Sequence, residues 1–429
     1  MTDAPQAASC PRTGRSRADA LSPGSLRPSD GLTAFLAVGV AWIAAGAACE
    51  LWYALDGPAD LLWLGLHMAF VGGVSQLIVG AGQFFACAFL ATEPPGLKAI
   101  RAELVTWNLA TVLIAVGVPT AIVALTGVGG LLVLVGLALF STQLAAMRRR
   151  SIQDFPWATR WYQSAAAFFA VGALLGPVMA EGSGWTRGSL LGAHLVLNIG
   201  GWFGTAIVGT LHTFYPSLTG TRLRFPRLQL PTWQLWIAGI PLLAVASAFD
   251  NKALAIAGWS LLLAAAAMLA VNLAASTIEG SPQSTAAWIV GAGQLFLLVG
   301  LAEGLALTVD DGPFAALIGA DRRQVLVPVL AGWIGLTVFG SLTHLLGLMA
   351  RVRSGPARAP AKRTHDLTAA AGAVLVAIGV AWLTFTGSDS TAPAPEIVLA
   401  GGYAVLVTRA AMLARRAAAA APVGIWSAA

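Results

Sequence analysis

The stretch Gly192–Pro216 reads GAHLVLNIGGWFGTAIVGTLHTFYP and decides the fold class. It is an apolar run longer than the roughly 20 residues that a helix needs to cross a bilayer, and it holds two of the five histidines, His194 and His212. Their separation is a whole number of α-helical turns, so a continuous helix would place both on one stripe, with Asn198 between them. The helical rise sets them roughly 27 Å apart, nearly the thickness of the hydrocarbon core. The stretch therefore predicts a membrane helix with an imidazole toward each face, and ionisable side chains in that setting indicate function.

The composition extends this interpretation to the whole chain. Of 429 residues, 57% are hydrophobic and only 10% are charged, and there are 48 glycines. A soluble domain carries about a quarter charged residues, whereas glycine-rich apolar chains are typical of packed membrane helices. The net charge of +6 lies in short loops, so we expect a lipid bilayer and no nucleic acid as partner. The three cysteines form no CxxC pair, which supports neither a disulfide framework nor a thiolate metal site.

We predict an all-α polytopic membrane protein with about twelve transmembrane helices. Residues 1–31 are polar and arginine-rich, and we expect a disordered cytoplasmic tail there, followed by a single transmembrane domain over 32–420. The predicted spans are 32–55, 61–91, 104–126, 129–147, 163–180, 189–216, 233–249, 252–275, 285–308, 325–350, 367–386 and 396–415.

The positive charges predict the orientation of these spans. With the N-terminus inside, 21 of the 25 lysines and arginines fall on inner segments, and only Arg187, Lys252, Arg322 and Arg323 fall outside. This asymmetry is the one that the positive-inside rule expects. We therefore predict an integral cell-membrane protein with both termini in the cytoplasm.

An internal repeat runs through the predicted spans. Gly201–Thr213 in span 6 reads GWFGTAIVGTLHT, and Gly332–His344 in span 10 reads GWIGLTVFGSLTH, with Gly, Trp, Gly and Gly in the same register. Gly72–Phe84 in span 2 is a weaker echo, GGVSQLIVGAGQF. The alternative is that glycine-rich spans resemble one another by chance. Otherwise the unit is four helices, repeated three times at about 32–150, 155–280 and 281–416.

Four of the five histidines lie in these three spans. His67 opens span 2 and His194 opens span 6, whereas His212 and His344 close spans 6 and 10. This places one pair toward the outer face and one toward the inner face. Neutral imidazole is a common metal ligand and an axial donor to haem iron, so we predict metal ligation by these four residues. A hydrogen bond from each imidazole to a neighbouring helix is the alternative.

Other residues near the outer pair fit a cofactor site. Asn198 lies one turn after His194 and would orient that imidazole or join two helices. Arg187 and Arg322 flank the outer ends of spans 6 and 10. They would neutralise haem propionates, although arginines at the membrane interface also occur for snorkelling alone.

The architecture and the text of span 6 carry a family resemblance. Twelve spans with histidines on spans 2, 6 and 10 resemble the catalytic subunit of haem–copper oxidases. The text HLVLNIGGWFGTAIVGTLHTFYPSLTGTRL (His194 to Leu223) is similar to NnrS-type membrane proteins of that superfamily, which contain haem and copper and are linked to nitric oxide metabolism. The resemblance implies haem b and copper as cofactors, nitric oxide as a small gas ligand and a redox partner protein. By this resemblance, His67 and His194 would be haem or metal ligands.

The chain departs from the oxidases at three places. Span 7 reads PTWQLWIAGIPLLAVASAF and lacks the two adjacent histidines of the copper site, and span 10 starts with QVLVPVLAG, without the His-x-His pair. The only lysine in a predicted span is Lys252, the first residue of span 8. Oxygen reduction coupled to proton pumping is therefore not expected, and His212 and His344 match no oxidase ligand.

Two other function classes remain open. A secondary transporter also has twelve helices and internal repeats, and it should show broken helices with polar groups at mid-membrane. A membrane anchor or assembly partner of a copper-containing reductase would need no chemistry of its own. The residues alone do not decide whether the protein is an enzyme.

Overall fold

The computed structural model describes residues 28–180, 187–280, 284–354, 365–386 and 394–419. Within these residues the chain is helical throughout and contains no strand. Twelve of the helices are long and apolar enough to cross a membrane, which agrees with the predicted polytopic architecture. The first begins at Pro28, four residues before the predicted start of span 1.

The helices follow one another along the chain with short connections. In chain order they are α1 (Pro28–Ala54), α2 (Asp60–His67), η2 (Met68–Val74), α3 (Ser75–Leu90), α4 (Leu97–Gly117), α5 (Val123–Arg150), α6 (Trp157–Ala180), α7 (Arg187–Leu195), η3 (Val196–Gly204), α8 (Thr205–Thr219), η4 (Pro226–Leu228), α9 (Gln229–Ala248), α10 (Lys252–Gly280), α11 (Thr285–Asp311), α12 (Pro313–Leu317), η5 (Ala320–Arg322), α13 (Arg323–Leu326), η6 (Val327–Gly335), α14 (Leu336–Ser354), α15 (Leu367–Phe385) and α16 (Ala394–Ala419).

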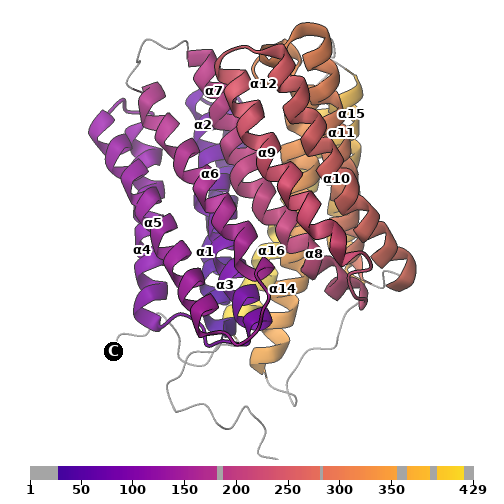
Figure 1. Cartoon of the computed structure of the whole chain (residues 1–429). Coiled ribbons are helices and arrows are strands. Elements are labelled where there is room, and N and C mark those ends of the chain that lie inside the picture. Colours follow the sequence, from indigo (N-terminus) through magenta and orange to yellow (C-terminus); the bar gives the residue numbers. More distant parts are fainter. Residues whose placement is uncertain (1–27, 181–186, 281–283, 355–364, 387–393, 420–429) are drawn as a thin grey trace, which may run out of the picture.

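The long helices stand side by side as one bundle (Figure 1). The helices α2, α7 and α12 lie in its upper part, and α3, α8 and α14 lie in its lower part. The three spans that carry the glycine echoes therefore all run from the upper end to the lower end. In the predicted topology the upper end is the outer one.

The boundary between spans 3 and 4 was predicted wrongly. The third span ends at Gly117 and the fourth begins at Val123, whereas the glycines from Gly127 onward suggested a break near 127. Gly129 and Gly130 are packing positions instead, because a Cβ would lie 2.7 Å from Ile114 Cγ1 at Gly129 and 3.1 Å from Pro177 Cγ at Gly130. The true turn contains Pro119, which cannot continue a helix, and Ala121 with a φ of 54°.

Three π-helical segments interrupt the spans that carry the glycine echoes. They are η2 in span 2, η3 in span 6 and η6 in span 10. The prediction of an uninterrupted α-helix over Gly192–Pro216 is wrong for the nine residues of η3. A π-helix bonds i to i+5 and is usually found as a short insert at functional sites. Hydrophobic periodicity alone does not reveal such a change in winding.

An aromatic side chain donates a hydrogen bond to a backbone carbonyl in each π-helical segment. Trp107 Nε1 donates to Val71 O at 2.8 Å, and Trp236 Nε1 donates to Gly200 O at 3.3 Å. Tyr403 donates its hydroxyl to Ala331 O. Each accepting residue directly precedes the first glycine of the repeated pattern. A backbone carbonyl in each wide π-turn is therefore hydrogen-bonded by a side chain from outside the segment.

The glycine that directly follows each of these accepting residues also faces an aromatic ring of the preceding long helix. A Cβ on Gly72 would lie 2.8 Å from the Trp42 ring, one on Gly201 would lie 2.6 Å from Phe168 Cβ, and one on Gly332 would lie 2.5 Å from Phe296 Cγ. No side chain fits at these distances, and close helix approach is what small residues permit in membranes. Spans 2, 6 and 10 thus share one packing contact as well as one sequence pattern.

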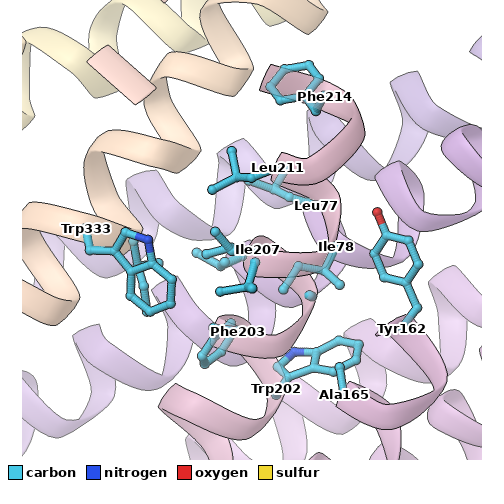
Figure 2. Packing of buried hydrophobic residues seen from close by; sticks show 14 of the residues in the cluster. Leu77, Ile78, Tyr162, Ala165, Trp202, Phe203, Ile207, Leu211, Phe214 and Trp333 are labelled. Atoms are coloured by element: carbon cyan, nitrogen blue, oxygen red, sulfur yellow. The ribbon is translucent and has the colours of Figure 1, made fainter. Parts of the chain in front are cut away.

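The centre of the bundle is an apolar cluster around span 6 (Figure 2). Trp202 is fully buried there, and its ring lies 6.3 Å from the ring of Trp107. Its indole nitrogen donates to Ser75 Oγ at 2.9 Å. This bond ties span 6 to span 2 directly below the level of the two upper histidines.

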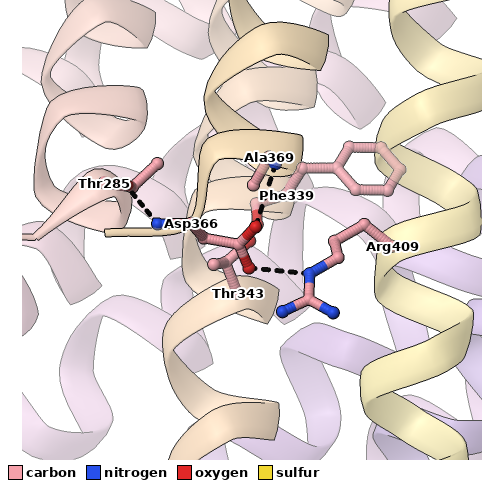
Figure 3. A network of polar contacts seen from close by, with 6 residues as sticks. All are labelled: Thr285, Phe339, Thr343, Asp366, Ala369 and Arg409. Carbon is pink, nitrogen blue, oxygen red and sulfur yellow. Dashed lines mark hydrogen bonds and ion pairs between the residues drawn. The ribbon is translucent and has the colours of Figure 1, made fainter. Parts of the chain in front are cut away.

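At the lower end, Asp366 joins three helices (Figure 3). Its carboxylate accepts from Arg409 Nε of α16 at 2.7 Å and from Ala369 N at the start of α15 at 3.1 Å. Its own backbone amide donates to Thr285 Oγ1, at the start of α11, at 2.9 Å. This buried ion pair and its neighbouring hydrogen bonds fix the position of α16 relative to the first turns of α11 and α15.

Candidate functional site

A cavity of about 630 Å³ opens between spans 2 to 6 in the upper half of the bundle. We call it the site cavity. His67 from α2 and His194 from α7 both line it, although 127 residues separate them in the chain. Most of the remaining lining is apolar, and the volume lies within the range of cofactor and ligand pockets, about 300–1,000 Å³.

The His67 ring is held from two sides. It stacks on the Trp63 ring with centroids 3.9 Å apart, and its Nδ1 lies 2.9 Å from Trp63 O. A carbonyl oxygen only accepts, so Nδ1 carries the hydrogen and donates it. The neutral ring then has an unprotonated Nε2, the nitrogen that binds a metal.

The His194 ring makes the same kind of hydrogen bond, but to a different helix. Its Nδ1 lies 2.9 Å from the carbonyl oxygen of Gly172 in α6, so this nitrogen also donates and Nε2 also keeps its lone pair. The approach needs a glycine, since a Cβ at Gly172 would lie 2.6 Å from Asn198 Oδ1. Metal-binding histidines commonly donate their other nitrogen to a backbone carbonyl.

Asn198 lines the site cavity but does not hydrogen-bond to the His194 ring. Its Nδ2 donates to the backbone carbonyl of His194 at 2.7 Å. Its Oδ1 is buried and has no hydrogen-bond partner among the described residues. Asn198 was predicted to orient the imidazole or to join two helices. In the structure it bonds to the main chain of its own helix, and its Oδ1 lies beside the cavity without a partner among the described residues.

The two lower histidines do not line the site cavity. His212 is fully buried, donates from Nδ1 to Val208 O at 2.8 Å and stacks on Trp161 of α6 at 5.7 Å. His344 packs edge-on against Phe214, with centroids 5.7 Å apart. His212 and Phe214 are two residues apart on α8 and therefore point to different sides. The two lower imidazoles thus contact different aromatic rings of the bundle.

Span 6 nevertheless turns both of its histidines toward the same neighbour. His194 contacts α6 through Gly172, and His212 contacts α6 through Trp161. The sequence predicted a common stripe from a regular α-helix. The structure instead reaches this arrangement through a π-helical insert.

The predicted arginines lie in different settings. Arg322 is exposed, and its Nη1 donates to Gly319 O at 2.9 Å, which closes the turn before span 10. It does not line the site cavity. The Arg187 side chain lies outside the described residues. Arg323 pairs with Glu396 at 2.6 Å, with both side chains about half exposed.

Glu103 is a buried acid that the sequence did not reveal. It is 1% exposed, its Oε2 accepts from Gln83 Nε2 at 2.5 Å, and its Oε1 has no partner in the described part of the chain. The predicted span 3 began at residue 104 and so left Glu103 in a loop. The sequence did contain a signal for Glu103, because it directly precedes an apolar run. An acid that lies within a membrane helix indicates a functional or paired group.

No three His, Cys, Asp or Glu side chains converge as a metal cluster within the described ranges. What converges at the site cavity is a pair of imidazoles. Comparison with protein-family models finds no match, and a search of curated proteins finds none either. The family resemblance of span 6 therefore stays a prediction.

Proposed function

We propose that this chain is a haem-binding integral membrane protein in which His67 and His194 supply the ligands. The observation that supports this most strongly is that two histidines far apart in sequence share one apolar cavity. Both have Nδ1 bonded to a backbone carbonyl oxygen. Each imidazole therefore has an unprotonated Nε2 and a fixed ring orientation, which are the properties of an axial ligand.

The residues present fit a haem better than a bare metal ion. A large apolar cavity with two nitrogen donors satisfies a macrocycle, which brings its own four nitrogens and its own apolar surface. Copper, the second metal that the resemblance implies, also takes imidazole ligands. A copper ion at His67 and His194 would still need further donors.

The chemistry that a bound haem supplies is ligation and one-electron reduction or oxidation of a small gas, and the resemblance favours nitric oxide. The protein's contribution is to hold the rings and exclude water. Trp63 covers one face of His67, and Phe70 and Phe203 close the lower wall of the site cavity with ring centroids 5.2 Å apart. A redox partner protein would supply or receive the electron.

We also propose that the chain is built from three four-helix units and that both termini lie in the cytoplasm. The support for the repeat is the recurrence of the π-helical segment, the glycine against an aromatic ring, and the aromatic donor to the preceding carbonyl in spans 2, 6 and 10. These recurring contacts favour a repeated unit over chance resemblance between glycine-rich spans, although the third donor, Tyr403, comes from α16 and not from the span that follows. The third unit has no histidine at its upper end.

Haem content and metal content of the purified protein test this function. We expect a pyridine haemochrome of b type at about one haem per chain, lost in His67→Ala and in His194→Ala and kept in His344→Ala. A protein that is colourless and metal-free after expression with ample haem would refute the proposal.

Transport is a second candidate, because the structure has the interrupted helices that transporters use. Polar side chains also meet beside two of the π-helical segments. Trp42 Nε1 donates to Asn108 Oδ1 at 2.6 Å, and Trp333 Nε1 donates to Gln294 Oε1 at 3.0 Å. A cofactor-free protein that moves a solute into proteoliposomes would favour this function over the first.

A further inference from the structure

A second, smaller cavity lies at the centre of the bundle, between spans 1, 2, 5, 6 and 10. We call it the central chamber. Its volume is about 80 Å³, and its walls include Leu77, Ile78, Ile207, Leu211 and Phe214. Figure 2 shows these side chains gathered in the space between span 6 and its neighbours, with Tyr162 on one side. All five are less than one-tenth exposed.

The chamber is lined so that water is poorly accommodated. A buried water needs two to four polar partners. The hydroxyl groups of Tyr162 and Thr210 are 2.6 Å apart and bond to each other, and Thr210 also donates to Ala206 O at 2.7 Å. Thr337 Oγ1 accepts from Gln294 at 3.0 Å. The Ser341 hydroxyl also lines the chamber, but most of the lining is carbon, so the chamber offers mainly contact with carbon atoms.

The size and the lining together select the occupant. A void lined by aliphatic and aromatic side chains stays dry and takes small apolar molecules such as xenon. A volume of about 80 Å³ admits a small molecule and is well below the roughly 300 Å³ at which cofactor pockets begin. The chemical class is therefore a small apolar gas.

The central chamber lies one helical turn below the site cavity along two helices. Phe70 lines the site cavity and Val74 lines the chamber, and the same step separates Phe203 from Ile207. The edge-to-face pair of Phe70 and Phe203, with centroids 5.2 Å apart, lines the site cavity on the two helices that continue to the chamber. Both rings belong to π-helical segments.

We propose that the central chamber is a docking site for a small apolar gas molecule, which exchanges with the histidine-lined site cavity past Phe70 and Phe203. Docking in the chamber depends only on the cavity itself. Exchange with a reactive centre rests on the proposed function. The two parts therefore have separate tests.

The first test is diffraction from the purified protein under xenon pressure. Xenon should give an anomalous peak between Leu77, Ile207 and Leu211 in the wild type. Ala81→Leu adds three carbon atoms to the chamber wall and should abolish the peak. Ala88→Leu makes the same change two turns later on α3, at an exposed position, and should leave the peak unchanged.

Two results would overturn the docking site: no xenon in the wild type, or equal occupancy in Ala81→Leu. Ile207→Ala is the complementary variant, because it enlarges the chamber and should raise xenon occupancy. It keeps the test decisive if Ala81→Leu does not fold. A xenon peak in haem-free protein would keep the docking site even if the proposed function failed.

The second test uses haem-loaded protein and flash photolysis of its carbon monoxide complex. A docking site that exchanges with the site cavity holds photolysed gas for a time and returns it. Ala81→Leu should therefore remove a slow rebinding phase that Ala88→Leu keeps. Identical rebinding in the wild type and Ala81→Leu would refute the exchange and leave only the docking site.

Discussion

Replacing Asp366 by alanine removes two interactions at once from the lower end of the bundle. One is the helix cap, in which the carboxylate accepts from Ala369 N. The other is the ion pair with Arg409, whose side chain is 13% exposed, against 12% for Asp366. Asp366→Ala thus leaves a guanidinium largely buried with no countercharge.

The two losses differ in size. Removing an aspartate cap costs about 1 kcal/mol. Breaking a buried ion pair by deleting one partner costs about 3–5 kcal/mol, because the remaining charge stays desolvated. The slight exposure of Arg409 lets it reach water in part, so we take the lower end of that range and expect Asp366→Ala to cost about 3–4 kcal/mol in all.

The assay is equilibrium unfolding in mixed detergent micelles, followed by tryptophan fluorescence and circular dichroism. Asp366→Ser keeps a capping oxygen and should recover about 1 kcal/mol of the loss. The double variant Asp366→Ala with Arg409→Leu removes both charges. It should be more stable than Asp366→Ala alone by about 2–3 kcal/mol, since a buried pair replaced by apolar groups is often nearly neutral.

Two results would refute this reasoning. If Asp366→Ala lies within about 0.5 kcal/mol of the wild type, as ordinary surface substitutions do, the ion pair and the cap do not hold the lower end together. If the double variant is less stable than Asp366→Ala, Arg409 is not left uncompensated when Asp366 is removed.

Substitutions at three further positions test the site and its surroundings. Gly172→Leu should separate α6 from span 6, break the bond to His194 Nδ1 and abolish cofactor binding, which haem content or metal analysis measures. Trp107→Phe removes the donor to the first π-helical segment and should cost about 0.5–1.5 kcal/mol of unfolding free energy; no change would mean that the segment needs no outside donor. Glu103→Leu leaves Gln83 without its acceptor and should cost about 1–3 kcal/mol, whereas Glu103→Gln keeps an acceptor and should lie near the wild type in the same unfolding assay.

The membrane architecture could be predicted because it depends on the length of apolar runs. Twelve such runs correspond to twelve helices, and most of their ends were placed within a few residues. The starts of spans 3, 5 and 7 lie six or seven residues before the predicted ones. The largest error, between spans 3 and 4, shows where composition stops being informative. In the sequence, Gly129 cannot be told from a turn glycine. Only its contact with Ile114 shows that it is a packing position inside a helix.

The sequence predicted which residue types form the candidate site, but it predicted much less of how these residues are arranged in space. Histidines inside apolar runs are rare enough to be noticed, and depth alone separated His67 and His194 from His212 and His344. The carbonyl of Gly172 that fixes His194 is a backbone atom on another helix, and no side-chain pattern predicts it. The π-helical segments were missed for the same reason, because residues in a π-turn keep the same apolar character as those in an α-turn.

The most direct test of the central claim is the optical difference spectrum, dithionite-reduced minus oxidised, of the purified protein and its variants. We predict the spectrum of a b-type haem in the wild type and in the matched control His344→Ala. His67→Ala and His194→Ala should each lose or shift that spectrum, since each removes one ligand of a shared centre. A haem spectrum that persists unchanged in both of these variants would contradict the claim that the two imidazoles hold the cofactor.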